Sequence, residues 1–479
     1  MKICFCVFVL GVTLCNAQQP PSRLNPAISR IVQNISEPRI EATLRKLESF
    51  GTRYSMSPAI REAEKWIAGE LRSYSPRLQV STHAFTLKKS PRALRDVELN
   101  NVIAVLPGTV HKDRFVIVSA HYDTVAYINK PVEDLDARIA KAIGEGMSEA
   151  EARAYLPLTP QDEVRGAPDL EKMDDPAWKA PGVNDDGSGT AAVMELARVM
   201  SGYEFDKSIV FVAFAAEEMG LVGSTAYAKD AKDKKMLIEA VLNNDIIGNE
   251  TAGNGRSASS RVRLFSAGPE DSLPRAVAVY AKEIGERYVP SMTVDLVLRQ
   301  DRFRRGGDHT PFAKEGFGAV RFTTASENYA FQHTPNDTLA NMSVPYNTRV
   351  ARVNAAVAAS LAMAPVAPQT TWNVSSGKTA GAKRGLLSRG KGGYDAVLRW
   401  IPVADADLAG YEVVMRSTAN PLWEKSIYVG NVREYTLPDV SVDDLIFGVR
   451  AIDKDGNPSL VSSYGLDSTP SASSAPGQQ

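Results

Sequence analysis

Side chains that can bind a metal ion follow three apolar segments of the sequence. His121 and Asp123 follow FVIVSA, Glu217 and Glu218 follow FVAFAA, and Asp245 follows AVLNN. Ligands of α/β sheets bind beyond the carboxyl ends of the strands. These side chains are therefore predicted to meet at one edge of a sheet.

Two loops add further candidate ligands: PGVNDDGSG contains Asp185 and Asp186, and ENYAFQHTPND contains His333. Imidazole and carboxylate are the groups that bind zinc where thiolates are absent. Two zinc ions about 3.5–4 Å apart can share a bridging carboxylate and a water molecule. The sequence supplies enough histidines and carboxylates for such a pair, with a Glu and an Asp to spare.

The adjacent pair Glu217-Glu218 suits hydrolysis for a geometric reason. Neighbouring side chains at the end of a strand point to opposite faces. One carboxylate can then bind metal while the other takes a proton from a metal-activated water, which is how a hydrolase works. Asp123 is placed to hold the free ring nitrogen of His121, as outer partners of ligating histidines do.

Composition sets the broad class of the protein. The chain has 479 residues, of which 44% are hydrophobic and 23% charged, and this length predicts two or three globular domains. Fifty-five Lys and Arg oppose 56 Asp and Glu. Because there is no basic excess, nucleic acid is not an expected partner.

Residues 1–17, MKICFCVFVLGVTLCNA, have the layout of a signal peptide. Their apolar run is shorter than the ~20 residues that a membrane-spanning helix needs, and no later segment qualifies. The expected location is therefore periplasmic or extracellular. All three cysteines, Cys4, Cys6 and Cys15, lie in this segment. Cleavage after Ala17 would leave a mature chain without thiolate ligands.

Alternation of predicted strands and helices defines the larger domain. From about residue 100 to 363, apolar strands alternate with helices, which predicts a parallel or mixed sheet covered on both faces. Helical periodicity over residues 24–76 precedes it. The predicted domain covers 24–365 and contains a polar insertion at 128–180.

The rest of the chain has a different composition. Residues 366–392 are rich in Pro, Gly, Ser, Thr and Lys and are predicted to be a linker. Short strands separated by turn residues over 393–465 predict a small all-β sandwich. The Ser-, Pro- and Gly-rich tail, 466–479, is predicted to be disordered.

The ordered motifs resemble a known family, the co-catalytic di-zinc exopeptidases. The motifs are SAHYD, PGVNDDGSGTAAVMELAR, FVAFAAEEMGLVGS, NNDIIGN, GGDHTPF and QHTPNDT. The family includes bacterial leucyl aminopeptidases, glutamate carboxypeptidases and the related glutaminyl cyclases. The resemblance covers about residues 25–363. It implies an α/β fold with a mixed, mostly parallel central sheet and helices on both faces.

The resemblance also implies a set of zinc ligands. Asp185 would bridge two zinc ions. His121 and Asp245 would complete one site, and Glu218 and His333 would complete the other. No metal position is empty, which argues against the non-catalytic relatives of the family.

Two further roles follow from the resemblance. Glu217 would be the general base that deprotonates the bridging water and later protonates the leaving amine, and Asp123 would orient His121. A glutaminyl cyclase is a less favoured alternative, because those enzymes resemble single-zinc proteins and lack the Asp-Asp-Gly-Ser-Gly stretch. A secreted binding protein is the alternative outside enzymes, and zinc content would distinguish it.

His121 and Asp185 lie 64 positions apart, farther than in the compact aminopeptidases. The extra segment, about 128–179, lies between two ligands and is expected to emerge beside the site. One hypothesis is a lid or wall that limits substrate size. The alternative is a peripheral decoration.

The segment RQDRFRRGGDHTPF raises the question of which substrate terminus is recognised. Four arginines, including Arg304 and Arg305, precede Asp308 and His309, which the family keeps near the substrate pocket. Arginine binds carboxylates in a bidentate manner, so this segment suggests a carboxypeptidase or dipeptidase. A solvated loop is the plainer interpretation. An aminopeptidase is favoured, because that activity is commoner among bacterial relatives. Tyr329 is a further candidate substrate contact.

The C-terminal module resembles fibronectin type III. AVLRW, DLAGYEVVMR and LIFGVRAIDKDGNPS follow that family's strand order, and Trp400 would fill the core. Leu445 stands where the family usually has a tyrosine, which puts the family's corner hydrogen bond in doubt. Such modules usually bind other molecules or act as spacers between domains, so contact with a surface or polymer is a hypothesis.

Overall fold

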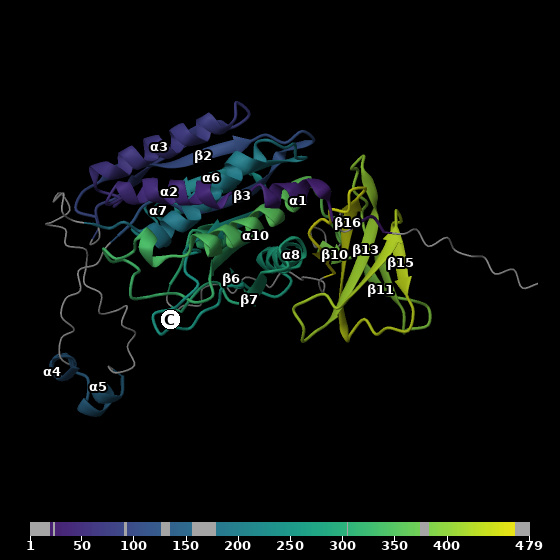
Figure 1. Ribbon diagram of the computed structural model, residues 1–479. Coiled ribbons are helices and arrows are strands. Elements are labelled where there is room, and N and C mark those ends of the chain that lie inside the picture. The colour runs from purple at the N-terminus through teal and green to yellow at the C-terminus, as the bar shows by residue number, and fades with distance from the viewer. Residues whose placement is uncertain are drawn as a thin grey trace, which may run out of the picture. The chain divides into compact units, whose positions relative to one another are not determined.

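The computed structural model describes residues 20–22, 24–90, 93–125, 135–155, 179–303, 305–373 and 383–464. The chain divides into two compact units (Figure 1). One is Leu24–Ala364, and the described residues from Pro365 onward belong to the other. The predicted signal peptide and C-terminal tail lie outside the described residues. Within the described ranges, no helix is both long and apolar enough to cross a bilayer.

The larger unit is built on one mixed sheet of eight strands in the order β1-β2-β4-β3-β5-β8-β6-β7. The strands are β1 (Gln79–Leu87), β2 (Val97–Leu106), β3 (His111–His121), β4 (Lys207–Phe214), β5 (Leu237–Asn244), β6 (Arg261–Ser266), β7 (Thr293–Val297) and β8 (Ala319–Thr324). The neighbours β4, β3, β5 and β8 run parallel in the middle of the sheet. The β1–β2, β2–β4 and β6–β8 pairs are antiparallel. The predicted mixed, mostly parallel sheet is confirmed at its centre.

Both faces of the central strands are buried. Every residue of β4, KSIVFVAF, is buried. On β3, Ile117 packs in a cluster with Tyr227 of α7 and Phe312 of α9. Its neighbours Val116 and Val118 are also fully buried, and they point to the opposite face of the strand. The continuous apolar runs seen in the sequence therefore reflect a sheet with helices on both sides.

Several helices of this unit have a proline at their first or second position. The helices are α1 (Pro26–Gln33), α2 (Glu37–Ser49), α3 (Pro58–Tyr74), α6 (Ser188–Met200), α7 (Val222–Asp233), α8 (Leu273–Tyr288), α9 (His309–Lys314) and α10 (Val344–Met363). A proline occupies the first or second position of α1, α2, α3, α8 and α10. The fixed φ of proline suits these positions, and its missing N–H has no helical partner there. Figure 1 shows α10 running alongside the sheet, and this helix contacts α1, α6 and α8.

The predicted insertion is described only in part. Residues 135–155 form α4 (Leu135–Gly144) and α5 (Glu149–Tyr155), which contact each other. Ile139 and Ala152 are buried. The other residues of the insertion up to 178 lie outside the described residues. The lid therefore remains a hypothesis.

The second unit consists of small antiparallel sheets. Its strands are β9 (Thr371–Asn373), β10 (Lys383–Gly385), β11 (Leu387–Arg389), β12 (Ala396–Arg399), β13 (Leu408–Ser417), β14 (Lys425–Gly430), β15 (Glu434–Leu437), β16 (Leu445–Asp453) and β17 (Ser462–Ser463). Sheets β11-β12-β15 and β14-β13-β16-β17 share one core, which includes Leu398, Val413 and Phe447. Trp400 lies in this core, as predicted.

The range predicted to be a linker, 366–392, contains paired strands among its described residues. β9 pairs with β10 inside this range, and β11 pairs with β12 of the module. Leu386 and Leu387 pack against the core of the module. The strands are three residues long and lie among Gly, Lys and Ser, so no alternating pattern was visible in the sequence. Strand pairing in this unit therefore begins before residue 393.

Candidate metal centre

The three predicted strand ends are neighbours in the sheet. β4, β3 and β5 lie side by side and parallel, so their carboxyl ends meet at one edge. His121 is the last residue of β3, and Asp245 directly follows β5. Glu217 and Glu218 lie in the turn after β4. The prediction that these side chains gather at one edge is confirmed.

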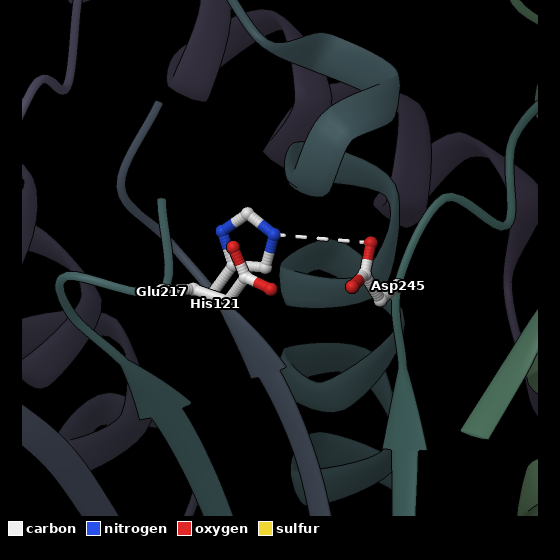
Figure 2. Close-up of side chains that lie close together, drawn as sticks. All are labelled: His121, Glu217 and Asp245. Carbon is white, nitrogen blue, oxygen red and sulfur yellow. Dashed lines mark ion pairs between the residues drawn. The ribbon is translucent and has the colours of Figure 1, made fainter. Parts of the chain in front are cut away.

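His121 lies at the centre of the site. Its Nε2 atom is 3.3 Å from Oδ1 of Asp185 and 3.8 Å from Oδ1 of Asp245. Figure 2 shows the His121 ring and the Glu217 carboxylate close together, with the Asp245 carboxylate facing the ring. The ligand atoms of these three residues lie within 4.8 Å of one another. A single cation placed among them could contact all three residues.

Asp185 lies between the two histidines. Its Oδ1 faces His121, and its Oδ2 is 3.0 Å from Nε2 of His333. The same His333 nitrogen is 3.1 Å from Oε1 of Glu218. His121, Asp185 and Glu218 form a second group whose ligand atoms also lie within 4.8 Å of one another. The structure thus brings all five predicted ligands together, with Asp185 between the two halves.

These residues fit a metal ion for a physical reason. Among the described residues, the buried His121 Nε2 and Asp245 Oδ1 atoms have no hydrogen-bond partner. Buried polar atoms are nearly always paired, because burial without a partner is costly. A cation would satisfy both atoms, and imidazole with carboxylate is a donor set that zinc accepts.

The electrostatics of the site also favour a cation. Burial raises the pKa of Glu217 well above that of an ordinary glutamate, and the nearby carboxylates add to the shift. Burial opposes the protonation of His121 and His333. Carboxylates outweigh burial in both cases, raising the pKa of His121 well above its usual value and that of His333 to about 10. The centre therefore carries an excess of negative charge that a divalent cation would offset.

Asp123 contacts His121, as the sequence suggested, and also binds the backbone of Glu217 and Glu218. The Nδ1 atom of His121 lies 3.1 Å from the main-chain oxygen of Asp123 and 3.5 Å from its Oδ1. The Asp123 carboxylate also accepts hydrogen bonds from the backbone N–H groups of Glu217 (3.1 Å) and Glu218 (3.3 Å). Asp123 therefore connects the end of β3 to the turn after β4.

Asp186 connects three ligand-bearing segments. This carboxylate is fully buried. Its Oδ2 accepts from the backbone N–H of His121 at 3.1 Å. Its Oδ1 accepts from Ile246 at 3.1 Å and from Gly189 at 3.0 Å. The strand end that carries His121, the segment after β5 and the start of α6 are therefore held at fixed positions.

The sequence motifs did not assign a role to Asp337. Its two carboxylate oxygens accept from the backbone N–H groups of Asn184 at 2.9 Å and Asp185 at 3.0 Å. The loop that carries His333 is thereby tied to the backbone of the central ligand. The motif QHTPND could have pointed to this role, because Asp337 follows the predicted ligand His333 by four positions.

Arg53 was also missed, and no local pattern pointed to it. Its guanidinium is fully buried and donates only to backbone oxygens. They belong to Leu47 (3.0 Å), Tyr122 (2.8 Å), Pro181 (2.7 Å) and Gly182 (2.8 Å). Arg53 thus joins the segment after β3 to the turn that leads to Asp185. These partners are distant in sequence, so only the fold reveals the role.

Left-handed backbone conformations lie beside the predicted ligands. Ala216, Ile246 and His333 have φ angles of 59°, 61° and 55°. Ala216 precedes Glu217, and Ile246 follows Asp245. Such conformations are uncommon for residues other than glycine and concentrate at functional sites.

The predicted substrate residues have different environments. His309 is fully buried, and its Nε2 lies 2.7 Å from the main-chain oxygen of Gln300. Asp308 is also fully buried, and burial raises its pKa to about 7. Arg305 retains 20% exposure of its side chain and lies 5.8 Å from the exposed Tyr329 ring. Arg304 lies outside the described residues. Of the four described residues, Arg305 and Tyr329 are the ones accessible to a substrate.

Comparison with known proteins identifies the family of this chain and several similar proteins. The model of Peptidase family M28 matches residues 101–358. A probable zinc metalloprotease of Leptosphaeria maculans is 32% identical over 462 residues, which cover 89% of this chain and 94% of that protein. A similar protein of Pyrenophora teres f. teres is 31% identical and covers 93% of this chain and 87% of that protein. The crystal structure of the Legionella pneumophila LapA aminopeptidase matches with a TM-score of 0.50 at 19% identity, covering 73% of this chain and 78% of that one.

The mixed sheet with a His/Asp/Glu centre at its carboxyl edge is the architecture of a metallohydrolase, and the relatives are described as probable zinc metalloproteases. The chain belongs to Peptidase family M28 and is a zinc-dependent peptidase. The Legionella structure, at its low identity, shows a shared fold.

Proposed function

We propose that this peptidase is a secreted exopeptidase that uses two zinc ions and acts as an aminopeptidase. The observation that carries the two-ion proposal is the position of Asp185. Its two oxygens face different histidines, His121 at 3.3 Å and His333 at 3.0 Å. A carboxylate with one oxygen toward each half of a centre suits the bridging position of a two-metal site.

Zinc bound at this centre would lower the pKa of a water molecule and polarise the scissile carbonyl. Glu217 is the proposed general base, which takes a proton from the attacking water and delivers it to the leaving amine. The backbone N–H of Glu217 donates to Oδ1 of Asp123 at 3.1 Å, which fixes the main chain that carries the Glu217 carboxylate. His121 keeps its Nε2 toward the centre because Nδ1 faces the main-chain oxygen of Asp123.

An aminopeptidase is supported by the resemblance of the motifs and by the name of the Legionella neighbour. The charge of the centre adds a physical argument. A protonated N-terminus is attracted to carboxylates, several of which meet at this centre. We infer that a free amine, rather than a blocked one, is the preferred end of the substrate.

A carboxypeptidase or dipeptidase is the second candidate, and one cluster favours it. Arg263, Arg302 and Arg305 all pair with the same buried carboxylate, Glu327. Arg302 also pairs with Asp301, so three guanidinium groups face two carboxylates, which leaves positive charge for another anion. Arg305, the residue of the three that also lies over Tyr329, is the one we would expect to bind a substrate carboxylate.

The experiment that separates these candidates uses one short peptide in four forms, with the amine free or acetylated and the carboxylate free or amidated. An aminopeptidase will lose turnover on acetylation and retain it on amidation. The opposite pattern would establish the carboxypeptidase. Arg305→Ala should raise KM for the free carboxylate only in that second case, and the exposed Arg299 provides a matched control, Arg299→Ala. Elemental analysis should find two zinc ions per chain, and one ion would contradict the proposal.

We further propose export through residues 1–17 and a tethering role for the second unit. The basis for export is the signal-like sequence, and N-terminal sequencing of the exported protein should begin at Gln18.

The basis for tethering is the resemblance to fibronectin type III, supported by a seven-stranded pair of antiparallel sheets with a core of their own. A chain ending at Ala364 should hydrolyse short peptides normally and lose any retention on a surface or polymer. Equal retention of both chains would contradict tethering.

A further inference from the structure

Arg321 is the cation that contacts a predicted zinc ligand most directly among the described residues. It lies on β8 and is fully buried. Its Nη2 atom is 3.0 Å from Oδ2 of Asp245 in an ion pair. Nothing in the sequence motifs or in the resemblance pointed to this residue, because GAVRFTT looks like an ordinary buried strand.

The two oxygens of Asp245 have different surroundings. Oδ1 faces His121 Nε2 at 3.8 Å and has no hydrogen-bond partner among the described residues. Oδ2 faces the guanidinium of Arg321. The backbone is fixed as well, because the N–H of Asp245 donates to the main-chain oxygen of Phe322, the residue after Arg321. One oxygen is therefore directed to the centre and the other to a cation of the protein.

Arg321 is itself held from its other side. Its Nη1 donates to both oxygens of Asp301, at 3.1 and 3.0 Å, and to the main-chain oxygen of Gly306 at 2.9 Å. A buried guanidinium with these contacts has little freedom to rotate. Its pairing with Asp245 is therefore a fixed feature of the site, unlike an exposed ion pair that exchanges with water.

We propose that Arg321 is a positioning residue for the metal centre, an inference that rests on the proposed two-zinc function. Because Arg321 occupies Oδ2, Asp245 can bind metal only through Oδ1. Arg321 also offsets the negative charge of Asp245, which is buried close to the carboxylates of Asp185, Glu217 and Glu218. Outer partners of this kind tune the affinity of a metal site as well as its geometry. The zinc ion that Asp245 holds is thus the one that depends on Arg321.

The same contacts link the metal centre to the arginine cluster. Asp301 accepts from Nε of Arg302 at 3.1 Å, and Arg302 pairs with Glu327 at 3.2 Å. Arg305 pairs with the same Glu327 oxygen at 3.2 Å. A continuous chain of ion pairs therefore runs from the Asp245 ligand to the accessible Arg305. We expect a change at Asp301, in the middle of the chain, to affect the same zinc ion more weakly.

The test is a zinc titration of metal-stripped protein, followed by calorimetry or chelator competition. Asp245→Asn identifies the site to which Asp245 belongs, because that variant should lose one of two zinc ions. Arg321→Met should weaken binding at this same site by about 10–100-fold and leave the other site within about threefold. Arg321→Lys retains the charge but not the planar fork, so it should recover part of the affinity. Asp301→Asn should fall between wild type and Arg321→Met.

Controls separate positioning from folding. Arg114→Met removes an arginine that pairs with Glu239 near the other end of β3, and it should leave both zinc affinities unchanged. The melting temperature of each metal-free variant is recorded in parallel. If Arg321→Met does not fold, the zinc affinity of Arg321→Lys, which keeps the buried charge, provides the test instead.

The outcomes distinguish two failures. If Asp245→Asn retains both zinc ions, the ligand assignment in the proposed function fails, and the role of Arg321 fails with it. If Asp245→Asn loses one ion but the Arg321 variants bind both ions as wild type does, only the present inference is overturned. Equal weakening of both sites would also overturn it, because a general structural role predicts that pattern.

Discussion

Glu217 and Glu218 are adjacent in sequence and have different surroundings in the structure. Oε1 of Glu218 lies 3.1 Å from His333, on the half of the centre that also includes Asp185. Glu217 belongs to the group with His121 and Asp245 and is partly exposed. Backbone contacts of Asp123 to both residues hold the pair in this divergent arrangement. At the scale of single residues, the two carboxylates are therefore suited to different tasks.

This difference leads to the first prediction. Glu217→Gln should retain two zinc ions per chain while kcat falls about 10²–10⁴-fold, because the amide cannot accept the proton. Glu218→Gln should instead lose zinc. Zinc content and kcat are measured on the same preparations. A Glu217→Gln variant with normal turnover would show that another group is the base, and one that loses zinc would make Glu217 a ligand.

At the scale of elements, the turn before α6 needs an unusually close approach of the backbone. Gly182 has a φ of 51°, and a Cβ atom there would lie 2.2 Å from Cγ2 of Thr124 and 2.6 Å from the main-chain oxygen of Asp185. The same glycine accepts from Arg53 at 2.8 Å. The turn that presents Asp185 is therefore packed directly against the segment after β3.

We expect Gly182→Ala to destabilise the protein by about 2–5 kcal/mol, because a left-handed alanine costs about 1–2 kcal/mol and overpacking adds about 1–3. It should also reduce zinc content. Gly51→Ala is the matched control, since Gly51 has a φ of 70° and a Cβ atom added there would meet nothing within 4 Å. Only the left-handed cost of about 1–2 kcal/mol applies there. Urea unfolding of both metal-free variants provides the comparison, and equal losses would contradict the packing argument.

At the scale of the whole molecule, the two units contain buried carboxylates with opposite pKa shifts. Burial raises the pKa of Asp453 in the second unit to about 6, although it accepts from the Asn457 backbone at 2.8 Å and side chain at 2.6 Å. In the peptidase unit, burial would also raise the pKa of Glu327. Arg302, Arg305 and Arg263 outweigh burial and lower that pKa to about 2.

The signs of the two effects follow from proton binding. Between the ordinary aspartate pKa of 3.8 and about 6, folded Asp453 binds more protons than unfolded Asp453 does. The stability of the second unit should therefore rise as the pH falls through this window. Glu327 has the opposite effect on the peptidase unit. Its ionised form stabilises the fold above pH 4.5, and this stabilisation is lost as the pH falls toward about 2.

Calorimetry of the full metal-free chain at pH 7, 5 and 4 tests the first effect. The unfolding transition of the second unit should gain on the order of 1–3 kcal/mol between pH 7 and 4 from Asp453. Asp453→Asn should remove most of this gain and leave the transition of the peptidase unit unchanged. An Asp453→Asn variant with the pH dependence of wild type would contradict the assignment.

Local patterns were enough to predict much of this protein. The apolar runs before His121, Glu217 and Asp245 identified buried strands, because a strand covered on both faces must be apolar throughout. Their parallel arrangement then implied that polar residues at their carboxyl ends would share one edge. Asp185 and His333 were identified by short motifs. The mixed sheet and the gathering of these five side chains were therefore accessible from the sequence.

Contacts between distant segments were decided only by the tertiary structure. Arg53 binds main-chain oxygens on both sides of the predicted insertion, and Arg321 meets Asp245 across neighbouring strands. Neither partnership leaves a periodic or compositional trace. The three-residue strands at 371–373 and 387–389 were also hidden, although their partners at 383–385 and 396–398 are near in sequence, because strand pairing, and not local propensity, creates them. The sequence determined which residue types reach the edge of the sheet, and long-range packing decided which buried charges hold them there.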